Sequence, residues 1–407
     1  MSQGSHPAKP DLLTVDAART AMLAAIEELT AERVALDAVY GRVLREGVRA
    51  GRDQPPFAVS AMDGYAVRSV DTPGLLRLAG ESAAGRGFEG RCGAGEAIRI
   101  STGAAVPGGT DTVVMQENVR REGDNVRVPV SSEGRNIRPR GGDFAAGKLL
   151  LESGRVLDGV AISLAAASGA ANVLVARMPR IAILSSGDEL AAPGTGPGPW
   201  QIFDSATFGM AGLIRGWGGT PNRLAVERDD VAAIACAARL GLAENDLLLV
   251  VGGASVGDHD HARPALMRLG LELTVEKVAV RPGKPTWFGV TPQGPVLGLP
   301  GNPASAMVCA HLFLRPILST MLGCVAAPTF HRARLARALP ANGPREHYLR
   351  ACWSSDDNGC LTVHAFEDQD SSLISVFTAA NALIRLPPNA PAIADGTAVD
   401  MLMLNRL

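Results

Sequence analysis

The sequence predicts a multidomain protein of the α/β plus β class, with a doubly wound α/β domain at its centre. Its 407 residues are more than one hydrophobic core normally supports. Strands and helices alternate from residue 179 to 326, whereas short apolar runs between Gly, Pro and Asp fill 53–144 and the region after 327. We therefore expect four domains: a discontinuous helical and extended domain (1–52 and 145–178), an inserted β-rich domain (53–144), the α/β domain (179–326) and a small C-terminal β domain (327–407).

Composition narrows the class of protein. Hydrophobic residues make up 46% of the chain, which excludes a disordered protein, and the net charge of −2 gives no general attraction to nucleic acid. The six cysteines form no CxxC motif and no His pair has zinc spacing, so we expect free thiols in a reducing cytoplasm. The first ten residues lack an apolar signal core, and Ser, Gly and Asn interrupt the most apolar window, 160–176. We therefore expect no membrane span, and a buried helix followed by a strand in that window.

Periodicity defines the elements of the first 178 residues. Apolar side chains recur at helical spacing from Val15 to Leu29 and predict a helix over 14–29, with a second short helix over 36–43. Valines alternate with other residues over 126–130, and the preceding Gly123-Asp124-Asn125 predicts the turn of a β-hairpin. Helical texture returns at 148–178, which indicates that the β-rich segment is an insertion.

The α/β pattern is clearest at the five-residue apolar run 247–251, which is typical of a central parallel strand. Pro303 stands where it can start a helix. We expect strands at 181–184, 223–226, 247–251, 275–280 and 296–299, helices at 208–217, 231–240, 262–269 and 304–318, and C-terminal strands at 361–366, 382–386 and 399–404.

Four glycine-rich loops carry the candidate site. They span 184–190, 251–260, 281–285 and 298–305, and each follows an expected strand. Ligands of doubly wound sheets bind at the carboxyl ends of the strands. Glycine lets backbone approach a ligand closely, carboxylates hold hard cations, and lysine or arginine neutralises phosphate. The loops therefore predict a site for a phosphate-bearing ligand, a divalent metal and a second anion.

The loops supply three kinds of functional group. Backbone amides and polar groups suited to a phosphate or pterin edge come from Ser186, Gly187, Gly252, Gly253, Ser255, Gly301, Asn302 and Ser305. Carboxylates suited to Mg²⁺ come from Glu189, Asp258 and Asp260. Cations suited to an oxyanion come from Lys277, Arg281 and Lys284.

Each group also has a purely structural interpretation, and these alternatives stay open at this point. The 184–190 loop can be a turn with solvated acids, and the aspartates of 251–260 can cap a helix that starts near His261. The 298–305 loop can open a capped core helix. A lone basic trio is usually a solvated face, but its place between two acid-bearing glycine loops favours anion binding. We expect His259 and His261 at the surface or in packing, because no third His or Cys lies nearby.

Taken together, the motifs resemble the molybdopterin molybdenumtransferase family, the molybdenum-insertion enzymes of molybdenum-cofactor synthesis. The matching segments run in order through almost the whole chain: Pro55-Pro56-Phe57, Ser60-Ala61-Met62-Asp63-Gly64-Tyr65-Ala66-Val67, Ile100-Ser101-Thr102-Gly103, Asn136-Ile137-Arg138, Asp143, Ser186-Gly187-Asp188-Glu189-Leu190, 252–258, Pro282-Gly283-Lys284-Pro285 and 298–303.

The resemblance implies a molybdopterin-binding α/β domain and a chemistry. Molybdate would be inserted into adenylylated molybdopterin with release of AMP, in a step that depends on Mg²⁺. It also implies a cytoplasmic homodimer with a composite site, in which the β-rich domain of one subunit faces the α/β domain of the other, and molybdoenzyme-specific chaperones as partners. By position, the residues similar to the family's functional set are Asp63, Thr102, Asp143, Glu189, Asp229, Asp260, Lys277, Arg281, Lys284, Arg350 and Ser371.

The sequence departs from the family pattern at the edge of the motifs. Ala58 and Val59 stand where many relatives carry Asp-Asn, and Ala206 stands where Asn is common. Arg281 replaces a frequent Lys, which keeps the charge and alters the donor geometry. Gly142 replaces a frequent Glu. None of these changes removes a charged residue of the implied site.

Two other functions remain as alternatives. The adenylyltransferase that precedes this step uses a similar pterin-binding α/β domain, but it usually stands alone in a shorter chain. A non-enzymatic scaffold is the second alternative, because receptor-clustering relatives use the fold to organise partners. The acidic and basic residues Asp63, Glu189, Asp260 and Lys284 argue against the scaffold.

Overall fold

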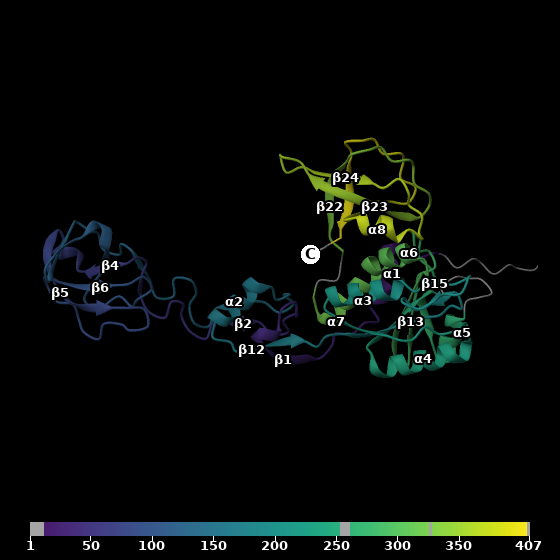
Figure 1. Cartoon of the computed structure of the whole chain (residues 1–407), viewed down its shortest axis with the longest axis horizontal. Helices are drawn as coiled ribbons and strands as arrows, with labels where there is room; N and C mark the ends of the chain where they lie inside the picture. The colour runs from purple at the N-terminus through teal and green to yellow at the C-terminus, as the bar shows by residue number, and fades with distance from the viewer. Residues whose placement is uncertain (1–11, 253–260, 325–327, 405–407) are drawn as a thin grey trace, which may run out of the picture. The chain divides into compact units, whose positions relative to one another are not determined.

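The computed structural model describes residues 12–252, 261–324 and 328–404. The chain forms two compact units, which Figure 1 colours along the sequence. Unit 1 combines the N-terminal residues up to Glu32 with everything from Ala176 onward, and unit 2 is 33–175.

Unit 1 contains a six-stranded sheet with the order β16-β13-β17-β21-β20-β18. Five strands run in the same direction, and four of them pair in parallel, as expected, whereas β20 runs antiparallel to both of its neighbours. The central strand β17 matches the apolar run 247–251 and is fully buried. The strands are β13 (Arg180–Ser185), β16 (Thr220–Arg223), β17 (Leu247–Val251), β18 (Glu272–Val275), β20 (Trp287–Thr291) and β21 (Gly294–Leu299).

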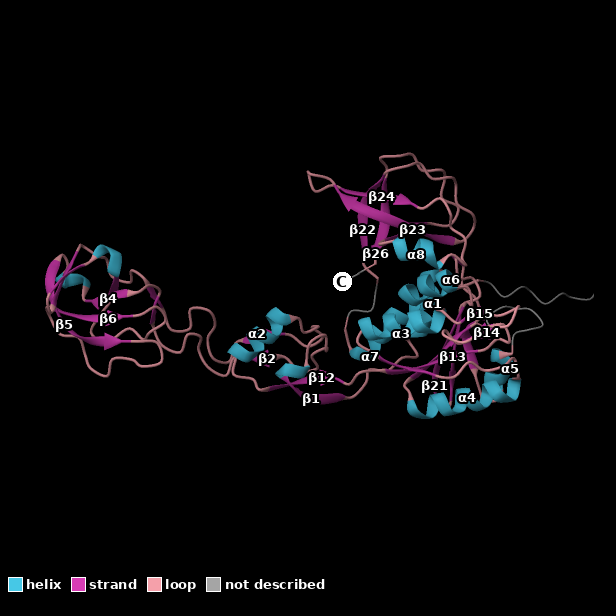
Figure 2. Ribbon diagram, viewed as in Figure 1, coloured by secondary structure: helices cyan, strands magenta, loops and turns pink. Residues whose placement is uncertain are grey.

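Helices cover both faces of this sheet because successive side chains of each strand point to opposite sides. Ile181, Leu249 and Leu297 pack under α1, α3 and the α6–α7 helix, whereas Ala182 and Leu248 pack under α4 and α5 (Figure 2). This two-sided core confirms the doubly wound architecture. The helices are α1 (Val15–Leu23), α3 (Ala206–Gly216), α4 (Val231–Glu244), α5 (Ala262–Met267), α6 (Pro303–Cys309), the π-helical turn η4 (Ala310–Leu314) and α7 (Arg315–Leu322).

The N-terminal helix differs from the expectation in length and in place. It ends at Leu23 because the chain then turns, and the amide of Leu29 donates to the carbonyl of Met321 at 2.8 Å. Val15, Ala18 and Met22 join the unit 1 core, so α1 packs with the α/β elements and not with the rest of the expected domain 1–52. The short helix expected over 36–43 is only a 3₁₀ turn, η1 (Leu36–Ala38).

The strand expected at 275–280 is divided between two sheets. Only its first residue, Val275, lies in β18, and the chain crosses over 276–279 to β19 (Val280–Arg281), which pairs with the C-terminal β23 (Glu346–Ser355). Similarly, the strand expected at 223–226 lies three residues earlier, in β16, because it pairs with β13 from Thr220.

The C-terminal part of unit 1 is a second six-stranded sheet with the expected strands. It also contains α8 (Ile374–Ala379), so the expectation of an all-β domain was wrong there; Phe377 of α8 packs into the unit 1 core. The strands beside β19 are β22 (Phe330–Leu335), β23 (Glu346–Ser355), β24 (Leu361–Ala365), β25 (Ala382–Leu386) and β26 (Ala398–Met403).

One helix of unit 1 has the length and composition of a membrane span. The continuous helix Pro303–Leu322 is long and apolar enough to cross a membrane, but 83% of its most apolar window is buried inside unit 1. It has the burial of a core helix. The window 160–176 forms a helix and then a strand, α2 (Gly159–Ala167) and β12 (Asn172–Ala176), as the sequence predicts.

Unit 2 contains the β-rich sheet, with the order β7-β4-β6-β5-β9-β8. The predicted hairpin joins β8 to β9 through Gly123 and Asp124. The strands are β4 (Gly64–Val67), β5 (Gly74–Ser82), β6 (Glu96–Ile100), β7 (Thr112–Met115), β8 (Arg120–Glu122) and β9 (Asn125–Val128), with η2 (Ser69–Asp71) and η3 (Gln116–Asn118) between them.

The rest of unit 2 surrounds α2. Its strands form small two-stranded pairs, and a separate apolar core that includes Leu44 and Leu157 contains residues of the β1–β12 and β2–β11 pairs. The pairs are β1 (Ala31–Ala35) with β12, β2 (Val48–Arg49) with β11 (Leu149–Leu151), and β3 (Val59–Ser60) with β10 (Ile137–Arg138).

Candidate functional site

A cavity of about 660 Å³ opens at the carboxyl ends of β13, β17 and β21 in unit 1. The chain leaves β13 to form β16 on one side and returns to form β17 on the other side, so the cavity lies at a topological switch point, where ligands of such sheets bind. The described residues that line it are Ser185, Ser186, Glu189, Leu190, Ile202, Phe203, Asp204, Ser205, Ala206, Val251, Gly252, Pro285, Pro300, Gly301, Asn302, Pro303, Ser372 and Ile374.

The loop after β13 brings Ser186 and Glu189 to the cavity. Ser186 is buried because the chain continues to pair there, with Gly187 donating its amide to the carbonyl of Glu227 at 3.1 Å. The Glu189 carboxylate folds back over Gly187, where a Cβ would lie 2.6 Å from Oε2. Glycine is thus required for this carboxylate position, although Gly187 itself does not line the cavity.

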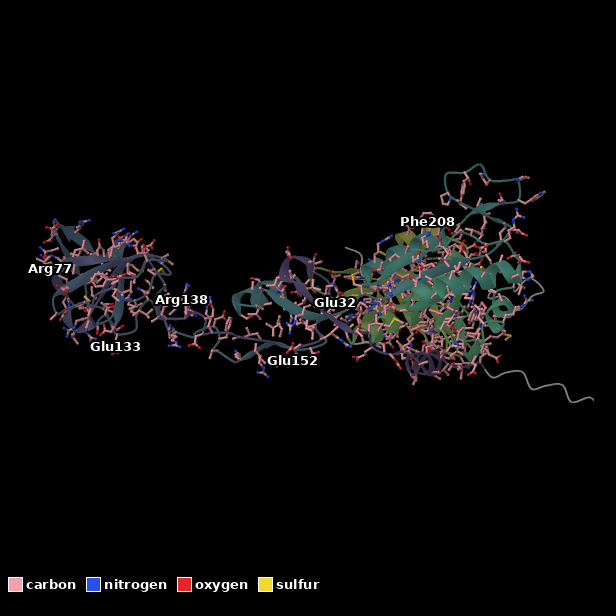
Figure 3. All side chains as sticks on the ribbon, turned by 90° about the horizontal axis from the view of Figure 1, so that it is seen from below. Glu32, Arg77, Glu133, Arg138, Glu152 and Phe208 are labelled. Atoms are coloured by element: carbon pink, nitrogen blue, oxygen red, sulfur yellow. The ribbon has the colours of Figure 1, made fainter. Side chains whose placement is uncertain are left out.

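Asp204 is a buried carboxylate on the cavity that was not among the residues selected from the sequence. It accepts from the Thr207 amide at 3.2 Å and from the Thr207 hydroxyl, at the start of α3. Arg223 lies 3.9 Å from its Oδ2 and 3.4 Å from the centre of the Phe208 ring. Phe208 is at the surface of unit 1 (Figure 3). An Asp three residues before a helical Thr is a helix-start signal that could have identified it.

The fourth glycine-rich loop presents Gly301 and Asn302 to the cavity, and Pro303 starts the helix behind them, as predicted. Asn302 Nδ2 donates to Ser371 Oγ at 2.8 Å, and the Ala304 amide donates to the Ser371 carbonyl at 3.2 Å. Ser371 therefore holds the loop from behind, while its neighbour Ser372 lines the cavity. Ser305 is buried within α6 and does not line the cavity.

Arg350 was expected to contact the ligand, and the structure gives it another position. It is only 2% exposed, and its guanidinium donates to the carbonyls of Asp368, Asp370 and Leu373 and to Gln369 Oε1. Its hydrogen-bonding capacity is largely used inside the protein. Arg350 is a positioning residue for the loop 368–373, which carries Ser371 and Ser372.

The basic trio lies where the chain crosses between the two sheets of unit 1. Lys277 precedes β19, and the turn after it is tied by a 3.1 Å bond from the Val278 amide to the Lys284 carbonyl. Gly283 has φ +113°, and a Cβ there would meet Cys309 Sγ at 2.1 Å, so glycine is obligatory in this turn. Only Pro285 of this loop lines the cavity. The trio itself does not.

A second basic group, which was not predicted from the sequence, adjoins Arg281. Arg281 pairs in register with His347, and Arg345 Nη1 donates to the Val280 carbonyl at 3.2 Å. Burial, and then the charges of Arg281 and Arg345, lower the pKa of His347 to about 4. Two permanent cations therefore flank a neutral imidazole. Only the pairing of β19 with β23 brings them together.

The candidate residues of unit 2 lie on turns of the β-rich sheet. Asp63 Oδ1 accepts from the Thr102 amide at 2.6 Å and from its hydroxyl at 3.0 Å, and these bonds lower the pKa of Asp63. The structure thus brings Asp63 and Thr102 together, from turns 39 residues apart in the chain. Asp143 is exposed, and its amide donates to the Gln54 carbonyl at 2.9 Å.

The remaining candidates fall outside the cavity or outside the described residues. Asp229 does not line the cavity, although the nearby Glu227 carbonyl holds the Gly187 amide. Gly252 lines it at the end of β17. Gly253, Ser255, Asp258 and Asp260 lie outside the described residues.

The donor groups at the cavity fit Mg²⁺ shared with a substrate. Within the described ranges, no group of three or more His, Cys, Asp or Glu side chains could hold a metal by itself. Mg²⁺ in phosphate-handling sites usually keeps several waters and takes one or two carboxylates plus substrate phosphate. Glu189 offers such a carboxylate, since in the described part of the chain no cation pairs with it, whereas Asp204 is already held by Thr207 and Arg223.

Comparisons with known proteins cover both units. Residues 13–169 match the family model of the MoeA N-terminal region (domains I and II), 182–320 match the probable molybdopterin-binding domain, and 332–404 match the MoeA C-terminal region (domain IV). The molybdopterin molybdenumtransferase of Nostoc sp. is 35% identical over 92% of this chain and 88% of its own length. That of Haemophilus influenzae is 32% identical over 97% of this chain and 100% of its own length.

Solved structures agree with this assignment. A crystal structure of the molybdopterin biosynthesis protein MoeA from Pyrococcus horikoshii has a TM-score of 0.84 at 28% sequence identity, over 98% of this chain and 100% of that chain. The fold and the sequence matches together define a multidomain transferase. The chain belongs to the molybdopterin molybdenumtransferase family. It is an enzyme and not only a scaffold.

Proposed function

We propose that this enzyme transfers molybdenum from molybdate into adenylylated molybdopterin, with release of AMP and dependence on Mg²⁺. The cavity at the strand ends carries the proposal. All of its lining residues except Ser372 and Ile374 belong to the segment that matches the probable molybdopterin-binding domain. The cavity brings glycine-rich loops with polar groups close to the Glu189 carboxylate. Such a cavity suits a ligand with a flat ring system and phosphate groups.

In this proposal the loops bind the pterin and nucleotide part of the substrate. Ser186, Gly252, Gly301 and Asn302 offer hydroxyl, amide and backbone groups at the cavity. Glu189 would hold Mg²⁺ beside the pyrophosphate, with Asp258 and Asp260 as further candidates. When bound, Mg²⁺ neutralises charge that develops on the phosphoryl oxygens.

The basic residues would act on the anions. Lys277, Arg281 and Lys284 are proposed to hold molybdate and to offset negative charge on the phosphoryl group as it is attacked. Arg345, near Arg281, adds a second positive charge there.

The β-rich domain would complete the site from a second subunit. We propose a cytoplasmic homodimer in which Asp63, Thr102 and Asp143 approach the cavity of the partner. The Thr102 hydrogen bonds fix the direction of the Asp63 carboxylate and lower its pKa, which suits a residue that accepts a hydrogen bond from a water and orients it. A four-domain division of the chain, with α1 assigned to the α/β domain, and delivery of the product to molybdoenzyme-specific chaperones are further parts of the proposal.

The experiment measures both products of the proposed reaction. The purified full chain is incubated with adenylylated molybdopterin, molybdate and Mg²⁺, and AMP release and protein-bound pterin molybdenum are followed by chromatography and mass spectrometry. We expect both to appear together, and Glu189→Gln and Asp63→Ala to slow both by roughly 100-fold.

The neighbouring Asp188→Asn is the matched control, because Asp188 is exposed and does not line the cavity. It should keep the wild-type rate. Molybdenum uptake without AMP release, or wild-type rates in both site variants, would contradict the proposal.

A further inference from the structure

The lining of the cavity includes both buried polar groups and exposed large apolar side chains. Ser185, Ser186 and Asp204 are at most 8% exposed and form its polar floor. The large apolar side chains are far more exposed: Ile202 at 63%, Phe203 at 47% and Ile374 at 36%. A ligand with hydrogen-bonding groups beside a flat ring would find partners for the groups at the floor and for the ring at the rim.

Phe203 is held rigidly at this rim. It lies on β15 (Ile202–Phe203), which pairs with β14 (Leu190–Ala191). The amides on either side are fixed, because Ile202 donates to the Glu189 carbonyl at 2.7 Å and Asp204 donates to the Ala191 carbonyl at 2.9 Å. A ring on such a ladder loses little freedom when a ligand covers it.

The loop that joins the two strands is closed at its base. Gln201 Nε2 donates to the Asp188 carbonyl at 3.1 Å, and Gln201 Oε1 accepts from the Gly198 amide at 3.0 Å. One side chain therefore bridges both ends of the loop 192–201, which keeps β15 in place beside Glu189.

Phe203 differs from a second phenylalanine of equal exposure nearby. Phe208 is also 47% exposed, but Arg223 already covers its ring at 3.4 Å from the centre. Among the described residues no aromatic or cationic group covers Phe203, and it is the one aromatic side chain that lines the cavity. The two phenylalanines are therefore a matched pair: the ring of Phe203 is open to a ligand, and the ring of Phe208 is covered by Arg223.

We propose that Phe203 is a specificity residue that stacks on a flat heteroaromatic ring of the substrate, with hydrogen-bonding groups of the substrate at the polar floor. The inference rests on the proposed function and extends it by naming the wall of the cavity that a ring of the substrate contacts. The shared ligand chemistry is a planar nitrogen heterocycle. Its two possible sources are the adenine of the nucleotide and the pterin.

Binding to the full chain tests the proposal, with calorimetry as the readout. The probes are AMP for adenine, a phosphorylated pterin for the pterin, and ribose 5-phosphate as a phosphate without a ring. Removal of base stacking typically weakens binding severalfold. We expect Phe203→Leu to weaken one ring-bearing probe by roughly fivefold or more, and to leave ribose 5-phosphate unchanged. The probe that loses affinity identifies the stacked ring.

Three variants serve as controls for the assignment of Phe203. Phe203→Tyr keeps a ring and should keep wild-type affinity, and Phe208→Leu should bind both ring probes as the wild type does. Trp200, 88% exposed and outside the cavity lining, is an alternative stacking residue. A loss of ring binding in Trp200→Leu instead of Phe203→Leu would overturn the assignment.

The outcome is separable from that of the proposed function. If the wild type inserts molybdenum and releases AMP, but Phe203→Leu binds every probe normally, the stacking inference fails and the proposed function stands. Equal losses for ribose 5-phosphate and the ring probes would also overturn it, as would the absence of measurable binding of both ring probes to the wild type. If the wild type binds the rings through Phe203 but does not insert molybdenum, the proposed function fails instead.

Discussion

Candidate site residues lie on the mainly parallel sheet of unit 1 and on the β-rich sheet of unit 2, and the two sheets hold them in different ways. In unit 1, the parallel strands β13, β17 and β21 end at one cavity, and buried groups such as Asp204 and Arg350 fix its walls. In unit 2, Asp63 and Thr102 lie on exposed turns and hold each other directly. The topology of the parallel sheet thus brings its site residues together at one edge, whereas the site residues of the β-rich sheet are held by direct hydrogen bonds between two turns.

This difference has a consequence for stability. Site residues in unit 1 depend on long-range burial, so changes behind the cavity should be costly. Site residues in unit 2 lie on exposed turns above closely paired strands. Substitutions in the strands should therefore lower the stability of unit 2 more than substitutions in the turns. Four measurements on the full chain test this, with hydrogen exchange to read each unit separately.

The largest effect is expected for Arg350→Leu in unit 1. The substitution removes a buried guanidinium and leaves the partly buried carbonyls of Asp368, Asp370 and Leu373 without this donor, so we expect a loss of about 3 kcal/mol in the free energy of unfolding of unit 1. Exchange should rise first in the loop 368–373. Arg337→Leu, at an arginine whose side chain is 74% exposed, is the control and should change little. Equal stability of the two variants would mean that Arg350 does not position the loop.

The next effect is expected for Gly64→Ala in unit 2. A Cβ at Gly64 would lie 2.0 Å from the carbonyl oxygen of Val114 on the paired strand β7, so the two strands must separate. We expect a loss of about 2–3 kcal/mol, seen as faster exchange in β4 and β7 only. Gly108→Ala, where a Cβ meets nothing within 4 Å, is the matched control. Unchanged exchange in β7 would show that the sheet tolerates the shift.

A fall in pH from 7.5 to 5 should destabilise unit 1 more than unit 2, because residues 33–175 contain no histidine. His311 is buried in unit 1 between Trp217 and Phe377, and burial lowers its pKa to about 3. Because the unfolded imidazole takes up a proton near pH 6.5 and the folded one does not, unit 1 loses stability as pH falls from 6.5 toward 3.

At pH 5 the loss from His311 is about 2 kcal/mol, and denaturant unfolding at pH 7.5 and 5 measures it. His347 acts in the same direction, since its pKa is also lowered. His311→Leu should reduce the dependence of unit 1 on pH in this range. A unit 2 that weakens as much as unit 1 at pH 5 would contradict the assignment.

The smallest effect is expected for Asp63→Asn. The side chain is exposed, and its bonds with Thr102 lower its pKa, so it remains ionised throughout pH 5–7.5. We expect no resolvable change in the thermal unfolding of unit 2 or in its pH dependence over that range, even where activity is lost. A marked drop in Tm would mean that the turn is part of the stability of the sheet.

Much of this fold could be predicted because it follows from local patterns. The run 247–251 gave a central parallel strand, Gly123-Asp124 gave a hairpin, and Pro303 gave a helix start, each where expected. Ser186, Glu189, Gly252, Gly301 and Asn302 were selected by sequence and do line the cavity. The failures have a common cause, since the split of 275–280 between two sheets and the packing of α1 on unit 1 depend on partners far away in the chain.

The sequence by itself determined which loops follow strands, where glycine lets the backbone turn, and which acids and bases are at hand, because these depend on neighbouring residues. Only the tertiary structure decided that Asp204 and Ser372 share the cavity with Glu189, that Arg281 adjoins Arg345, and that Arg350 lies buried behind a loop. Burial and the pairing of distant strands are properties of the whole chain packed together, and no local spacing encodes them.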